Sequence, residues 1–181
     1  MASKGTKIGL IILGIILVLA IAIVILLWKV GFFASPELSV DERGPYQYVY
    51  VQRTGPFSEI PQGFKQADSL VKQQGIDVGI ECGAYLDNPA QVAQDDLRWR
   101  TGYIVEDSVQ TRAPLEFETI VRQQYLVGSI DAIPMVAIIK IYPLMQEWLT
   151  KNAYTVTGPA YELYNENGVV EVLFPISKGT Q

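Results

Sequence analysis

The chain has 181 residues, which allows one globular domain and little more. It contains no histidine and a single cysteine, which together exclude a Ser-His-Asp triad, a Cys-His dyad, a His-containing zinc site and an intrachain disulfide. Its 14 basic and 19 acidic residues give a net charge of −5, and because such a surface repels phosphates we expect no nucleic-acid partner.

The first predicted element is an unbroken apolar run over residues 8–28. As a helix rising ~1.5 Å per residue it would span ~30 Å, the thickness of a bilayer's hydrocarbon core, and Trp28, Phe32 and Phe33 would suit the interfacial belt. The alternative is a cleaved signal peptide, whose apolar core is normally only ~7–15 residues and whose cleavage site needs small residues. Because residues 29–33 are too bulky for such a site, we predict an uncleaved transmembrane anchor with the lipid bilayer as its partner.

Charges on either side of the anchor bear on its orientation. Lys4 and Lys7 lie in the N-terminal tail 1–7, whereas only Lys29 follows the anchor. Because positive charges favour the cytoplasmic side, the small excess before this single-pass anchor favours a cytoplasmic N-terminus and an extracytoplasmic domain. Residues 29–45 are predicted to form a linker that is too short to reach far, so the domain should sit close to the membrane.

The domain begins with a predicted strand, a helix and two more strands. Residues 46–53 are rich in aromatic and β-branched side chains and end at a Thr-Gly-Pro turn signal. Apolar residues then recur at helical spacing until Gly75, a typical helix cap. Residues 80–86 and 97–106 are predicted strands separated by a polar loop.

The second half repeats this order. We predict a strand over 124–130, a helix over 136–152 that Pro143 kinks or restarts, and two strands over 160–164 and 169–175. Each half has one sheet face to cover and one helix to cover it. The sequence thus predicts an α+β fold: duplicated strand-helix-strand-strand units form one antiparallel sheet with two helices and a cleft where they meet, preceded by a single transmembrane helix. The alternative is a generic α+β domain without symmetry.

Five short motifs carry a more specific signal, and they are Gly55-Pro56-Phe57, Tyr85-Leu86-Asp87-Asn88-Pro89, Leu97-Arg98 leading to Gly102, Tyr161-Glu162-Leu163-Tyr164 and Phe174-Pro175-Ile176. Their order resembles the gyrase-inhibitor-like small-molecule-binding domain, which is also the effector-binding module of some bacterial multidrug-responsive regulators. The resemblance covers residues 46–176 and leaves 177–181 as a C-terminal tail. An anchor followed directly by this domain is similar to the arrangement in a testis-expressed autophagy receptor of the endoplasmic reticulum, but without that receptor's acidic tail its role is not carried over.

The resemblance implies a ligand cleft with aromatic walls and a buried carboxylate. The acid of the Tyr-Glu-x-Tyr motif matches Glu162, and strand alternation places Tyr164 on the same sheet face. Burial would raise the pKa of Glu162, and a carboxylate among aromatic rings suits a cationic or polar aromatic ligand. The candidate wall residues are Tyr48, Tyr50, Trp99, Tyr103 and Trp148.

Plainer interpretations stay open for these residues. Glu162 could be solvated or paired with Arg98 or Arg100, and each aromatic residue could serve ordinary core packing. We expect no cofactor and no metal site, because the acids Asp87, Asp95 and Asp96 lack the number and spacing of ligands in a calcium loop.

Three functions fit the sequence. The first is a membrane-anchored domain that binds a small-molecule ligand and acts as a sensor or sequestering protein. The second is a cofactor-independent hydrolase of strained electrophilic compounds, with Glu162 as the candidate catalytic residue. The third is an adaptor that binds a protein partner at the membrane surface.

Overall fold

The computed structural model describes the backbone of residues 4–179 and the side chains of residues 12–179. Within that range the chain has three α-helices and nine antiparallel strands. The helices are α1 (Lys4–Lys29), α2 (Ile60–Gln74) and α3 (Pro134–Asn152). The strands are β1 (Glu37–Arg43), β2 (Tyr46–Thr54), β3 (Glu81–Tyr85), β4 (Arg98–Val105), β5 (Glu116–Ile120), β6 (Gln123–Asp131), β7 (Tyr154–Val156), β8 (Ala160–Tyr164) and β9 (Val169–Lys178).

The sheet is built from two similar units. Its strand order is β1-β6-β9-β8-β3-β4-β2-β5, with β7 paired to β9. The first unit supplies the neighbouring strands β3, β4 and β2 with helix α2, and the second supplies β6, β9 and β8 with helix α3. The units meet where β3 pairs with β8. The predicted α+β fold, with two repeated units in one antiparallel sheet, is confirmed.

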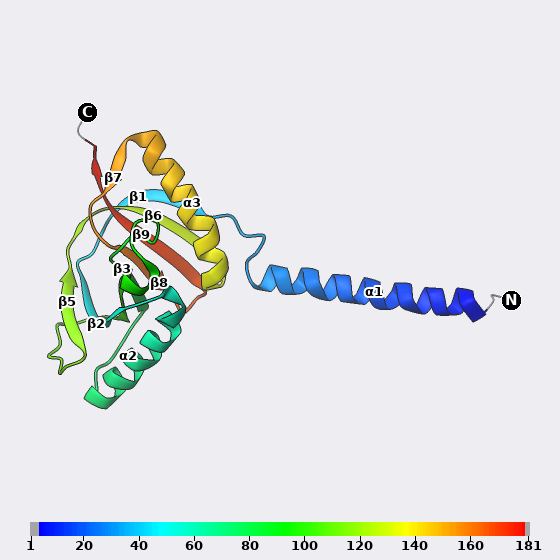
Figure 1. Cartoon of the computed structure of the whole chain (residues 1–181), viewed down its shortest axis with the longest axis horizontal. Helices are drawn as coiled ribbons and strands as arrows, with labels where there is room; N and C mark the ends of the chain where they lie inside the picture. The colour runs from blue at the N-terminus through cyan, green and yellow to red at the C-terminus, as the bar shows by residue number, and fades with distance from the viewer. Residues whose placement is uncertain (1–3, 180–181) are drawn as a thin grey trace.

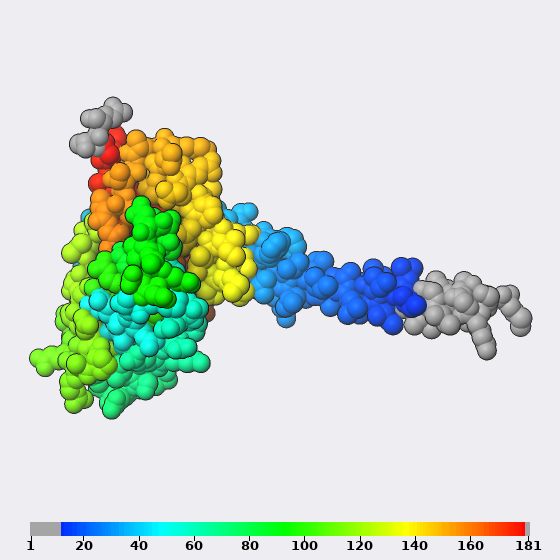
Figure 2. Space-filling model, in the orientation of Figure 1, coloured from blue at the N-terminus to red at the C-terminus, as the bar shows by residue number. Residues whose placement is uncertain are grey.

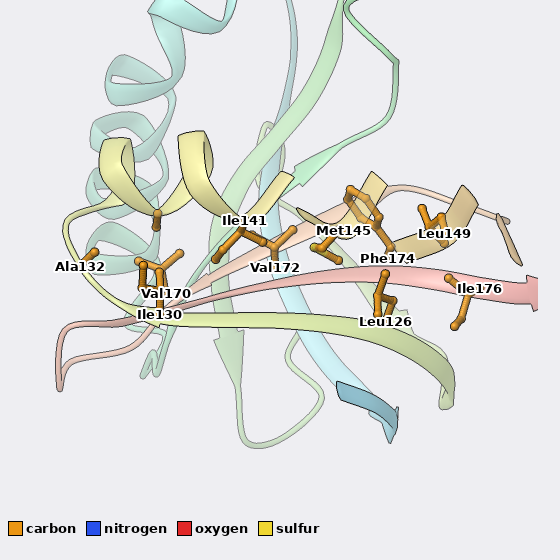
Figure 3. Close-up of a cluster of buried hydrophobic side chains, with 11 residues drawn as sticks. Leu126, Ile130, Ala132, Ile141, Met145, Leu149, Val170, Val172, Phe174 and Ile176 are labelled. Atoms are coloured by element: carbon orange, nitrogen blue, oxygen red, sulfur yellow. The ribbon is translucent and has the colours of Figure 1, made fainter. Parts of the chain in front are cut away.

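Helices α2 and α3 cover the same face of this sheet, while α1 projects away from it (Figure 1). Under α3, Ile141, Met145 and Leu149 are buried against β6 and β9, where they meet Leu126 and Val172 (Figure 3). Under α2, a second cluster of buried residues joins Ala67 and Val71 of the helix to β2 and β4. Apolar residues at helical spacing on the helices thus meet one face of the strands, where every second residue points toward them.

The opposite face of the sheet has its own core. Tyr48 and Tyr50 of β2 lie in one buried cluster with Tyr125 of β6 and Tyr161 of β8. Because β2 and β6 are far apart in the strand order, their shared cluster requires a strongly curved sheet. Tyr48 and Tyr50 stack with ring centroids 5.0 Å apart, and Tyr125 meets Tyr161 edge to face at 6.5 Å.

The prediction of a linker over residues 29–45 is wrong for its second part. Glu37–Arg43 forms strand β1, which pairs with β6 from Glu37↔Ser129 to Arg43↔Gln123. The strand lies at the edge of the sheet and is mostly solvated, so its sequence is polar enough to look like a linker. Strands β5 and β7 were also not predicted, and both are short.

The end of α1 is fixed to the start of α3. Gly31 adopts a left-handed φ of 74°, and a Cβ there would lie 2.4 Å from the carbonyl oxygen of Asp131, so only glycine fits. The backbone N–H of Ile133 donates to the carbonyl of Val30 at 3.2 Å. From α3, the Lys140 ammonium donates to the carbonyl oxygen of Ala34 at 2.6 Å. The chain therefore leaves α1 through a tight elbow that holds the domain against the helix end.

Candidate functional site

Glu162 lies at the centre of the sheet, on the face that α2 and α3 cover. It stands on β8 opposite Gly83 of β3 and Val172 of β9, at the seam between the two units. Only 2% of Glu162 is exposed, although an ionised carboxylate is costly to bury without partners. The residue therefore needs hydrogen-bond donors from the surrounding protein.

Three tyrosine hydroxyls supply those donors. Tyr142 of α3 donates to Oε1 of Glu162 at 2.6 Å. Tyr85 of β3 donates to Oε2 at 3.0 Å, and Tyr164 of β8 donates to the same oxygen. The hydroxyls of Tyr85 and Tyr164 are themselves 3.4 Å apart. One carboxyl group thus connects both units of the sheet to α3.

Gly83 gives Tyr85 the space to reach this carboxyl. A Cβ at Gly83 would lie 3.1 Å from the Tyr85 hydroxyl and 3.3 Å from its ring carbon Cε2. The tyrosine ring therefore extends over the glycine toward β8. Strand β3 has the residues Gly-Ala-Tyr at this point, so the small residue and the ring point to the same face.

A second layer of aromatic rings surrounds the tyrosines. Phe57 meets Tyr85 edge to face at a centroid distance of 5.3 Å, and Phe64 of α2 meets Tyr164 at 5.8 Å. On the other side, Tyr142 meets Phe174 of β9 at 5.5 Å. The carboxyl therefore lies among rings contributed by both halves of the domain, which lowers the local polarity around it.

Burial raises the pKa of Glu162 above its ordinary value, and the hydrogen bonds from Tyr142, Tyr164 and Tyr85 oppose this rise. Burial also raises the pKa of each of these tyrosines, with the negative charge of Glu162 as the next cause. The raised pKa values favour the protonated phenols, which can donate to the carboxyl.

This raised pKa predicts how stability depends on pH. Below the ordinary glutamate pKa the acid is protonated in both the folded and the unfolded chain, so burial carries no charge penalty. As pH rises from that value, the unfolded chain ionises first and the folded state loses stability until pH passes the raised pKa. We expect the free energy of unfolding of the native chain to fall relative to Glu162→Gln over this window.

The measurement is urea unfolding of both proteins over roughly pH 4 to 8, which starts near the ordinary glutamate pKa. The glutamine variant is the matched control because it shares every other titrating group. The raised pKa of Glu162 would be contradicted if the difference in free energy of unfolding between the two proteins stayed constant with pH. It would also be contradicted if the native chain became relatively more stable as pH rises.

Glu162 has no cationic partner among the side chains that the structure describes. The arginines that could have paired with it pair elsewhere: Arg98 binds Asp87 at 2.7 Å and Arg100 binds Glu118 at 2.6 Å. The carboxyl is thus compensated by hydrogen bonds alone. A buried acid with donors but no counter-cation is a site at which a positively charged ligand gains both an ion pair and removal of its apolar surface from water.

The predicted site residues divide between the two faces of the sheet. Tyr164 contacts Glu162, whereas Tyr48 and Tyr50 belong to the cluster on the opposite face. Trp99 shares the face of Glu162 but is fully buried, and its indole N–H donates to the carbonyl of Gly55 at 2.9 Å. The remaining two lie away from the carboxyl: Tyr103 is in the cluster under α2, and Trp148 packs on Tyr154.

Sequence reasoning missed two of the three tyrosines that donate to Glu162, Tyr85 and Tyr142. Tyr85 has a signal in the sequence, because it lies two positions after Gly83 on a predicted strand and therefore on the same face. Tyr142 precedes Pro143 within α3, and its partner lies on a strand of the same unit 20 residues later. That contact depends on how the helix is rotated on the sheet, which the sequence pattern did not define.

Two surface pockets do not include the Glu162 carboxyl in their lining. The larger, of about 660 Å³, is away from the site and is formed by the end of β2, residues 111–117 up to the start of β5, and Gln66 of α2. The smaller, of about 250 Å³, is lined by Lys29, residues 131–134 and the β8–β9 hairpin, including Tyr164. At Glu162, where a cleft was predicted, the carboxyl is buried and its oxygens are occupied by the three tyrosine hydroxyls.

Comparisons with known proteins identify the domain. Residues 36–177 match the family described as the GyrI-like small molecule binding domain. Among solved structures, the EcmrR C-terminal domain has a TM-score of 0.67 at 16% identity, over 79% of this chain and 98% of that one. An integron cassette protein from Vibrio cholerae has a TM-score of 0.58 at 8% identity, over 80% and 99%. The protein SAV2435, solved with bound tetraphenylphosphonium, has a TM-score of 0.52 at 14% identity, over 78% and 94%. No curated protein is similar enough in sequence to count as a relative.

Proposed function

The chain belongs to the GyrI-like small-molecule binding domain family, and from this premise we propose that it is a membrane-anchored receptor for a lipophilic cation, acting as a sensor or sequestering protein. Its binding site is the Glu162 carboxyl with Tyr85, Tyr142 and Tyr164. The observation that carries the proposal is a carboxyl that is 2% exposed, has three hydroxyl donors and faces no Lys or Arg in the described residues.

The chemistry of the surroundings favours a cation with apolar groups. Aromatic faces attract cations, and Phe57, Phe64 and Phe174 stand behind the three tyrosines. A strongly hydrated small cation would lose too much hydration among these rings, whereas a large cation with a spread charge loses little. Tetraphenylphosphonium, which SAV2435 binds on a similar fold, has these properties and is the probe of choice.

The proposed anchor is helix α1 together with the elbow that follows it. Residues Ile12–Lys29 are apolar enough and long enough to cross a bilayer, and none of this window is buried against the domain. Lys29 stands at the end of the span, and the elbow leads directly into the domain. We propose an extracytoplasmic domain on the charge argument from the N-terminal tail.

Tyr142 offers a route from binding to a signal. Its hydroxyl joins α3 to the carboxyl, and Lys140, two residues earlier on the same helix, joins α3 to the anchor elbow. A cation that takes the place of the Tyr142 hydroxyl would release this link. If no other protein responds to this release, ligand binding alone would make the domain a sequestering protein.

Hydrolysis is a weaker candidate for this site. A general base needs a free lone pair and a water molecule within hydrogen-bond reach. Of the roughly four acceptor positions on the Glu162 carboxylate, three are taken by phenol hydroxyls. The carboxyl is therefore better placed to hold a ligand than to activate water.

The test compares two ions of the same shape and opposite charge. Tetraphenylphosphonium and tetraphenylborate are titrated calorimetrically into the purified full chain in detergent, with empty micelles subtracted. We expect the cation to bind at least about tenfold more tightly than the anion, a difference of about 1.4 kcal/mol. Equal affinity for both ions would mean that shape and apolar surface alone govern binding, and the proposed role of Glu162 would be withdrawn.

A further inference from the structure

An exposed apolar stripe lies at the start of α3, beside the end of α1. Ile133 is 44% exposed, Met135 71% and Ile139 68%. Met135 and Ile139 are four residues apart and share one side of the helix. The other side of the same turns is buried in the core through Ala137 and Ile141. The stripe therefore does not stabilise the domain, although it consists of large apolar side chains.

The position of this stripe is fixed relative to the anchor. Lys140 donates to the carbonyl of Ala34, and its ammonium lies 5.5 Å from the centroid of the Phe32 ring. The N–H of Ile133 donates to the carbonyl of Val30. Figure 2 shows the first turns of α3 directly beside the base of α1. The stripe thus stays within one or two turns of the residue at which the candidate span ends.

Phe32 and Phe33, in the elbow itself, are a second group of exposed apolar side chains. They are 49% and 58% exposed and meet edge to face at a centroid distance of 5.5 Å. The Lys140 ammonium lies over the Phe32 ring, and Lys29 precedes the two rings in the chain, so if α1 spans the bilayer both cations would be near lipid phosphates. Aromatic rings with flanking lysines are typical of segments at a membrane–water interface.

We propose that the stripe of Ile133, Met135 and Ile139, together with Phe32 and Phe33, inserts into the interfacial layer of the same bilayer that holds α1. This inference rests on the proposed membrane anchor, and it adds a second membrane contact made by the ligand-binding domain itself. The occupant is lipid and not a protein, because the stripe lies at the end of the candidate span and, among the described side chains, the two cations Lys29 and Lys140 outnumber the one acid beside it, Asp131.

The same stripe leads toward the ligand site. Tyr142 lies three residues beyond Ile139 on the same side of α3, and its hydroxyl binds Glu162. Docking would therefore bring the α3 edge of the site next to the headgroup layer. A lipophilic cation held at that layer could reach Glu162 without passing through bulk water.

The experiment measures the depth of single positions in the bilayer. The full chain, with an environment-sensitive fluorophore on Met135→Cys or Ile139→Cys, is reconstituted in phosphatidylcholine nanodiscs with and without spin-labelled lipid. Native Cys82 is fully buried and should not react. The matched control is Gln146→Cys, which lies on the same side of α3, about 16 Å along the helix from position 135 and about 10 Å from position 139. Leu17→Cys in α1 reports on the anchor itself.

We expect a blue-shifted emission and several-fold stronger quenching at positions 135 and 139 than at 146. If positions 135 and 139 behave like 146 while position 17 is quenched, the docking is overturned and the anchor proposal stands. If position 17 also escapes quenching, both proposals fail. A blue shift at positions 135 and 139 without quenching by lipid would mean that protein covers the stripe, which also overturns the docking.

Discussion

Replacing Glu162 with glutamine is expected to weaken tetraphenylphosphonium binding by roughly 30-fold, about 2 kcal/mol, the lower end of the range for losing one partner of a buried charge pair. The substitution keeps the size of the side chain and removes the acid that three tyrosines surround. A cation would then meet a neutral amide in place of a carboxylate. The measurement is the same calorimetric titration of the full chain.

Glu166→Gln is the matched control for this variant. Glu166 lies in the exposed turn between β8 and β9, so its substitution changes the net charge equally without touching the site. We expect its affinity to equal that of the native chain. Affinity in the native chain should also rise with pH, because binding of a cation favours ionisation of Glu162, and the glutamine variant should lose this dependence. Unchanged affinity in Glu162→Gln would remove the central support for the proposed function.

Gly102→Ala is expected to prevent folding, with a loss of more than about 4 kcal/mol, which is rare for a single substitution. Gly102 lies on β4, paired with Tyr50 of β2 and Cys82 of β3. A Cβ at this position would lie 1.9 Å from the carbonyl oxygen of Val49 and 2.7 Å from the Cα of Tyr50. Both are backbone atoms inside the sheet, so no side-chain rotation relieves the overlap.

Gly158→Ala is the control for Gly102→Ala. The Cβ added there would meet only the side-chain ring carbon Cγ of Pro175 on β9, at 3.3 Å, and no backbone atom within 4 Å. Chemical unfolding followed by tryptophan fluorescence reports on the fold, because Trp99 is fully buried next to β2. We expect Gly158→Ala to unfold within about 1 kcal/mol of the native chain. A folded Gly102→Ala of near-native stability would show that the strands around β4 can separate without cost.

Local patterns predicted the fold well because the buried strands are strongly apolar. Residues 46–53 and 169–175 alternate or run with β-branched and aromatic side chains, and the structure has strands there. The edge strand β1 was missed because one of its sides needs no apolar cover, so its sequence ELSVDER has no such signal. Strand β1 pairs with β6, which is distant in the sequence, and such a pairing produces no pattern in the local sequence of β1.

The site was predictable only in part, for a related reason. Alternation along β8 placed Glu162 and Tyr164 together, because both lie on one strand. Alternation shows which residues of a strand share a face, but it does not show which face the helices cover. Tyr48 and Tyr50 were therefore candidates, although they lie on the face opposite Glu162. Tyr142 contacts Glu162 because of how α3 is rotated on the sheet, and the packing of the buried side of α3 determines that rotation.

The elbow at Gly31 has a consequence for how such a receptor would be filled. If α1 spans the bilayer as proposed, a domain held at its end by this elbow samples mainly the thin layer of solution next to the lipid. Lipophilic cations partition into that layer, so occupancy would follow their density at the surface and not their dilution in the medium. A receptor with modest intrinsic affinity could then be saturated by traces of ligand, whereas a released domain in free solution would stay empty.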